Sequence, residues 1–128
     1  MIYYPMSILM LANIRDILII SSPEHIGFYK ELFGDGAHLG LNISYEIQPE
    51  PRGVAQAYTV GATFVGDEPS ALILGDNLLY GHGMVEMLER AGSLTEGGLV
   101  FAYKVPRAEP KTTTVLSTPQ ARKFSSAF

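Results

Sequence analysis

The sequence predicts an α/β fold in which helices cover both faces of a mainly parallel sheet, giving three layers. Short runs rich in Ile, Leu and Val alternate along the chain with segments of helical character. These runs show little polar alternation, which is typical of strands buried on both faces. Glycine, proline, asparagine and aspartate separate the segments, as expected for turns between regular elements.

The first half of the chain contains a helix, a strand and a second helix. We expect the first helix over Tyr3–Asn13. The near-continuous Ile/Leu run at Asp16–Ile20 predicts the first strand. Ser22 is the expected N-cap of the next helix, because Pro23 then occupies the first helical position, and this helix should run to about Phe33.

The rest of the ordered pattern continues the alternation of strand and helix. It predicts, in order, a strand at Leu41–Ile47, a helix at Val54–Phe64, a strand at Ala71–Leu74, a helix at Met84–Arg90 and a strand at Leu99–Tyr103.

Composition and charge restrict the class of protein. A chain of 128 residues is long enough for one domain. Its net charge of −4 and the lack of a basic stripe argue against a nucleic-acid partner. The absence of cysteine excludes disulfides and thiolate metal sites, and it fits a cytoplasmic location. The apolar segment 1–20 is interrupted by Asn13, Arg15 and Asp16, so we expect no membrane span.

One candidate site lies where the predicted strand Ala71–Leu74 ends. Gly75 and Asp76 follow this strand directly. Ligands of open α/β sheets bind at the carboxyl ends of the strands, and a carboxylate there can hold a divalent cation. An ordinary turn is the alternative, because Gly, Asp and Asn favour turns.

A second candidate lies in segment 48–57, which follows the predicted strand Leu41–Ile47. Prolines and a glycine constrain this loop, and the residues after Gly53 can open a helix. A rigid loop that ends at a helix N-terminus presents backbone N–H groups to an anion or a base edge. Gln48 carries both a donor and an acceptor, so it can read a nucleobase. A proline-stiffened connection without function is the alternative.

These two segments together carry a family resemblance. Segment 48–57 reads Gln-Pro-Glu-Pro-Arg-Gly-Val-Ala-Gln-Ala, segment 74–77 reads Leu-Gly-Asp-Asn, and segment 81–83 reads Gly-His-Gly. In this order and spacing they resemble the sugar-1-phosphate nucleotidyltransferases, most closely their thymidylyltransferase branch. The resemblance implies a Rossmann-like nucleotidyltransferase sheet, here incomplete.

The resemblance also implies a role for particular residues. Asp76 aligns with a ligand of Mg²⁺. Gln48 and Gly53 align with positions that hold the base, Val54 with an apolar contact to it, and Leu74 with the lining beside Asp76. No catalytic side chain is assigned.

Substrates and partners follow from the resemblance as well. It implies transfer of dTMP from dTTP to glucose-1-phosphate, with dTDP-glucose and pyrophosphate as products, and assembly into homo-oligomers. A non-catalytic module that binds nucleotides or nucleotide sugars remains the alternative.

The resemblance does not cover the whole pattern of the family. The family's glycine-rich phosphate loop and its C-terminal half have no counterpart here, so we expect residues 1–105 to form a partial nucleotidyltransferase domain that is inactive alone. Residues 106–128 read as a tail outside the family, rich in Ser, Thr and Pro. Such composition predicts disorder. The sudden end of family-like sequence after Tyr103 also suggests a shifted reading frame, with an authentic but divergent tail as the alternative.

Overall fold

The computed structural model describes residues 1–94, 97–101, 115–117 and 123–127, with side chains described up to residue 101. The helices are α1 (Tyr3–Leu11), α2 (Ile26–Phe33), a short 3₁₀ helix η1 (Ala37–Leu39), α3 (Gln56–Val60), α4 (Ala62–Val65) and α5 (Met84–Gly92). The strands are β1 (Asp16–Ser21), β2 (Asn42–Ile47), β3 (Ser70–Leu74), β4 (Leu99–Phe101), β5 (Val115–Ser117) and β6 (Lys123–Ala127).

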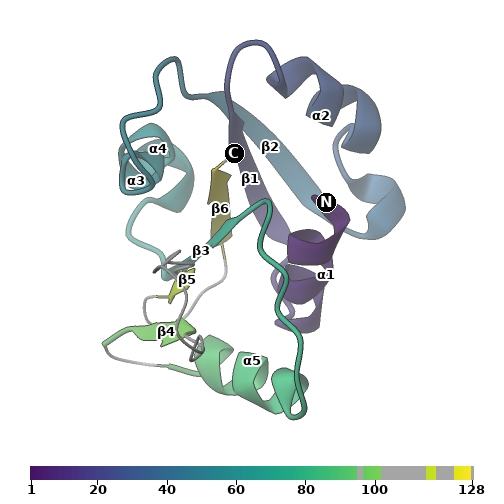
Figure 1. The fold of residues 1–128 in the computed structure, drawn as a ribbon, viewed down its shortest axis with the longest axis vertical. Helices are drawn as coiled ribbons and strands as arrows, with labels where there is room; N and C mark the ends of the chain where they lie inside the picture. Colours follow the sequence, from purple (N-terminus) through teal and green to yellow (C-terminus); the bar gives the residue numbers. More distant parts are fainter. Residues whose placement is uncertain (95–96, 102–114, 118–122, 128) are drawn as a thin grey trace, which may run out of the picture.

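The strands form one sheet in the order β2-β1-β6-β3-β5-β4. The four strands β2, β1, β6 and β3 are mutually parallel, whereas β5 pairs antiparallel with both β3 and β4. Helices α1 and α2 lie on one side of this sheet, and α3 and α4 lie on the other (Figure 1). The predicted α/β class with a mainly parallel sheet is therefore confirmed.

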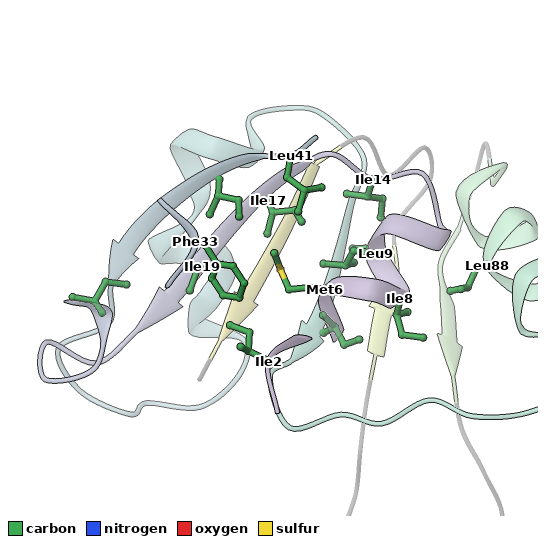
Figure 2. Packing of buried hydrophobic residues seen from close by; sticks show 14 residues of the cluster. Ile2, Met6, Ile8, Leu9, Ile14, Ile17, Ile19, Phe33, Leu41 and Leu88 are labelled. Carbon is green, nitrogen blue, oxygen red and sulfur yellow. The ribbon is translucent and has the colours of Figure 1, made fainter. Parts of the chain in front are cut away.

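Two apolar clusters hold the three layers together. In β1, Ile17 and Ile19 face the helices α1 and α2, whereas Leu18 and Ile20 face α3 and α4. All four side chains are 0–1% exposed, which explains why the strand shows no polar alternation. Figure 2 shows the larger cluster, in which side chains of α1 and α2 pack onto the strands. Its members include Ile2, Met6, Leu9, Ile14, Ile17, Ile19, Phe33, Leu41, Ile43 and Ile73.

Two helices differ from the prediction. Helix α2 begins at Ile26 and not at Pro23, since residues 23–25 form a turn; the Ser22 hydroxyl bonds the ring Nδ1 of His25 at 2.9 Å and caps no backbone N–H. The helix expected over Val54–Phe64 is divided at Gly61 into α3 and α4. Glycine lowers helix stability, so an interruption at this position is physically reasonable.

Part of the expected tail lies in the sheet. Residues 115–117 and 123–127 form β5 and β6, and β6 occupies the position between β1 and β3. These two segments are therefore strands and not disordered, because their backbones pair with strands that lie far away in sequence. Composition alone misses such pairing. The other residues of 102–128 lie outside the described part of the chain.

Tyr45 of β2 forms hydrogen bonds with the C-terminal end of α2. Its hydroxyl lies 2.7 Å from the carbonyl oxygen of Gly34 and 3.2 Å from that of Tyr29. Burial, and secondarily the negative charge of Asp35, raises the pKa of Tyr45 above its usual value of 10.0. The folded state therefore holds this proton more tightly than the unfolded state. The stabilisation is complete below pH 10 and is lost as pH rises through the folded pKa.

We expect Tyr45→Phe to lower the free energy of unfolding by about 1 kcal/mol at pH 7, because one set of hydrogen bonds is lost. The variant should also lose less stability than the wild type above pH 10. Urea unfolding at pH 7 and pH 10.5 measures both effects. Tyr80→Phe is the control, because Tyr80 is fully exposed. A wild type and a Tyr45→Phe variant with the same pH profile would contradict the prediction.

Candidate functional site

Strands β1, β2 and β3 end at the same edge of the sheet. Ser21, the last residue of β1, pairs with Ile47, the last residue of β2. Ile20 of β1 and Leu74 of β3 both lie opposite Ala127 of β6. The loops that follow these parallel strands therefore leave one carboxyl edge, which is where ligands bind in open α/β sheets.

Gln48 lies directly after β2 at this edge. Its backbone N–H donates to the carbonyl of Ser21 at 2.9 Å, which extends the parallel ladder by one residue. Its side-chain Nε2 donates to Oε1 of Gln56 at 2.7 Å. With only 9% of its surface exposed, Gln48 is held in place through both its backbone and its side chain.

Residues 49–55, between Gln48 and α3, form an exposed loop. Gly53 has φ +96°, a conformation that side chains with a Cβ rarely adopt, and no atom lies within 4 Å of where a Cβ would be. Val54 beside it is 40% exposed. Arg52 pairs with Glu50 at 2.6 Å in solvent, so its positive charge is balanced within the loop. This surface is accessible to a ligand and carries little net charge.

Asp76 lies two residues beyond β3 and is exposed. Its neighbour Asn77 is buried, and the backbone N–H of Asn77 donates to the carbonyl of Leu74 at 3.1 Å. Side-chain contacts of Asn77 with the N–H of Leu74 and with Oδ1 of Asp76 are longer, at 3.4 and 3.5 Å. Asn77 therefore closes the turn, and the exposed Asp76 carboxylate has only this long contact with Asn77 among the hydrogen bonds of the described residues.

Leu74 shares a face of the sheet with α3. It is partly buried and packs against a cluster of Leu18, Ile20, Ala57 and Leu72, in which Ala57 belongs to α3. The predicted residues thus form two groups. Gln48, Gly53 and Val54 follow β2, whereas Leu74 and Asp76 belong to the end of β3.

The two groups lie at the same edge but are separated by strands β1 and β6. Three strand spacings correspond to about 14 Å. This figure applies to the ends of β2 and β3, whereas the loop after Gln48 leads into α3, whose Ala57 packs in the same cluster as Leu74.

Metal-ligating side chains are sparse in this region. Within the residues that the structure describes, no three His, Cys, Asp or Glu side chains lie close enough to hold a metal ion. A cation beside Asp76 would take most of its oxygen ligands from water or from the bound molecule. A hollow of about 240 Å³ between α5 and β4 lies elsewhere, lined by Met87, Arg90, Leu99, Val100 and Phe101.

Two residues of this edge received no role from the sequence. Gln56 is the partner of Gln48, and Asn77 fixes the turn that carries Asp76. Both stand inside the motifs that carry the family resemblance. Their roles depend on contacts with other residues of the motif, which residue type and spacing do not reveal.

Comparison with known proteins gives consistent matches. The family model described as nucleotidyl transferase matches residues 1–120. A glucose-1-phosphate thymidylyltransferase from Xanthomonas campestris is 54% identical over 105 residues, which are 82% of this chain and 36% of that protein. The protein of the same name from Neisseria meningitidis is 50% identical, over 85% of this chain and 38% of its own length. The chain therefore spans little more than a third of these relatives.

Another relative and a solved structure extend the comparison. The glucose-1-phosphate thymidylyltransferase from Actinoplanes is 37% identical over 126 residues, which are 98% of this chain. A crystal structure described as a glucose-1-phosphate thymidylyltransferase from Bacillus anthracis matches with a TM-score of 0.62 at 24% identity. It covers 93% of this chain and 56% of its own, and it supports the fold. No helix among the described residues is long and apolar enough to cross a membrane.

Proposed function

The chain belongs to the nucleotidyl transferase family, and we propose that it carries the nucleotide-binding edge of a glucose-1-phosphate thymidylyltransferase. The proposal is supported chiefly by the position of Gln48 and Asp76 at one carboxyl edge of the parallel sheet. Relatives about 50% identical over more than four fifths of the chain bear this name.

The proposed reaction transfers a nucleotidyl group. A phosphate oxygen of glucose-1-phosphate forms a bond to the α-phosphorus of dTTP. The bond from that phosphorus to the oxygen bridging to the β-phosphate breaks, and pyrophosphate leaves with the electron pair. Negative charge builds on the phosphate oxygens during this step, so the protein acts by positioning the reactants and neutralising that charge.

Mg²⁺ fits the Asp76 end of the edge. The carboxylate of Asp76 is exposed, and its contact with Asn77 is a long one of 3.5 Å. A hard cation that keeps several waters and binds phosphate oxygens needs only one or two protein carboxylates. When bound, such an ion neutralises charge on the triphosphate. Asp76 is therefore proposed to hold the metal and the phosphates at the end of β3.

The base is proposed to bind at the other group. Gln48 would contact the base through its side chain, Gly53 through its exposed backbone and Val54 through its exposed apolar surface. Leu74 lines the edge next to Asp76. The ends of β2 and β3 are about 14 Å apart. A nucleoside triphosphate, which has its base and its phosphates at opposite ends, can contact residues that follow both strands.

Gln48→Met tests the base-binding group. We expect the 128-residue chain to bind dTTP with Mg²⁺, and the variant to bind it about tenfold more weakly, because it retains the volume of Gln48 but cannot hydrogen-bond. Isothermal titration calorimetry measures both affinities. Asn42→Leu is the matched control, because Asn42 is an exposed amide at the opposite end of the same strand, and it too loses a side-chain hydrogen bond, which its Nδ2 donates to Asp16 at 2.9 Å. A wild type that binds no dTTP, or variants with equal affinity, would overturn the proposal.

A further inference from the structure

We infer that Gln56 is a positioning residue that decides which atoms of the Gln48 amide face the base. The inference rests on the proposed function and makes it more specific. With Gln56 in place, the site accepts a pyrimidine that carries a hydrogen on ring atom N3, as thymine and uracil do, and rejects cytosine.

The direction of the hydrogen bond between the two glutamines is fixed by a third group. Oε1 of Gln56 accepts from Nε2 of Gln48 at 2.7 Å and, in a longer contact of 3.3 Å, from the backbone N–H of Arg52, which also donates to the carbonyl of Glu50 at 2.9 Å. A backbone N–H can only donate, so the Gln56 atom that it contacts must be the oxygen. The atom of Gln48 that contacts this oxygen must then be the nitrogen.

This order leaves the Gln48 oxygen available. Among the described residues, no hydrogen bond is recorded for Oε1 of Gln48, and this atom is not one of the buried polar atoms without a partner. Within the described residues Oε1 therefore has no protein donor, in a residue that is 9% exposed as a whole. Rotation of the amide by 180° would place two oxygens against each other, which the bond from Arg52 to Gln56 makes unfavourable.

An available acceptor selects among pyrimidines of equal size. Thymine and uracil present an N–H donor at ring position 3, whereas cytosine presents a bare nitrogen acceptor there. A cytosine nitrogen opposite Oε1 of Gln48 would leave two acceptors facing each other in a largely buried contact. Sites that hydrogen-bond a specific donor reject ligands that lack it.

The experiment compares dTTP with dCTP, because the two ligands carry the same phosphates. We expect the wild-type chain to prefer dTTP by about tenfold or more. Gln56→Met removes the acceptor at similar volume and frees the Gln48 amide to rotate, so the ratio of affinities should fall close to one. Gln56→Glu keeps an acceptor for both donors, so the ratio should be retained even if its charge weakens the binding of both triphosphates.

Side-chain amide NMR supplies a second readout without nucleotide. The Nε2 protons of Gln48 should be protected from exchange in the wild type and in Gln56→Glu, and unprotected in Gln56→Met. An unchanged dTTP/dCTP ratio in Gln56→Met, with binding retained, would overturn the inference and leave the proposed function intact. Failure of the wild type to bind either nucleotide would overturn both.

Discussion

Asp76→Asn should remove the metal-dependent part of dTTP binding while leaving the fold unchanged. The substitution keeps the size of the side chain but replaces an exposed carboxylate at the end of β3 by a neutral amide, which is a poor ligand for a hard cation. Loss of an outer-sphere partner of a metal ligand already costs about 10–100-fold in metal affinity, so loss of a direct ligand should cost at least as much.

Mn²⁺ is the probe for this prediction, because its effect on water proton relaxation reports binding to the protein. Titrations with and without dTTP should show a bound complex for the wild type and a much weaker one for Asp76→Asn. Asp67→Asn is the matched control, because Asp67 is an exposed carboxylate that precedes β3 at the opposite edge of the sheet. Equal Mn²⁺ binding by the wild type and Asp76→Asn would remove Asp76 from the site.

The sheet was predictable because its strands are buried on both faces. The Ile/Leu run of β1 and the apolar run of β3 stand out in any sequence window, and parallel order follows from their alternation with helices. The start of α2 was not predictable in the same way. Ser22 and Pro23 form an ordinary helix-start signal, but the ring of His25 takes the serine hydroxyl, and that contact depends on rotamers.

The strand β6 shows a second limit of the sequence. Its backbone pairs with β1 and β3. The paired residues Leu74 and Ala127 are more than fifty positions apart in the sequence. The composition of β6 also gives no strand signal of the kind seen in β1. Pairing of this kind is decided by the vacant hydrogen bonds of neighbouring strands, which are properties of the assembled sheet.

The candidate site likewise contains residues that were predictable from the sequence and residues that were not. The positions of Gln48 and Asp76 at the carboxyl edge were predictable because each follows a buried strand, and their roles in binding stay predictions. Gln56 and Asn77 act on those residues through side-chain or backbone contacts, and only the folded chain brings these groups within hydrogen-bond distance. The sequence motif contained all four residues, but it could not say which of them hydrogen-bond to one another.

Phe33→Ala should be the most destabilising of the substitutions considered. Phe33 is 1% exposed at the end of α2, and its ring meets that of Tyr3 edge-on with 5.4 Å between centroids. It lies among the side chains of α1 and β1 in the larger cluster (Figure 2). Truncation of a buried phenylalanine to alanine costs about 3–5 kcal/mol, which is much of the 5–15 kcal/mol that typically stabilises a domain.

Phe28→Ala makes the comparison decisive, because Phe28 lies in the same helix and undergoes the same chemical change while being 66% exposed. The free energy of unfolding of this control should change by no more than about 0.5 kcal/mol. Urea denaturation followed by circular dichroism measures both variants. A large loss for Phe33→Ala alone would show that the α2 layer is part of the cooperative core that holds the carboxyl edge. Equal losses for both variants would mean that α2 does not pack as the structure places it, and the positions of β2 and Gln48 would then lose their support.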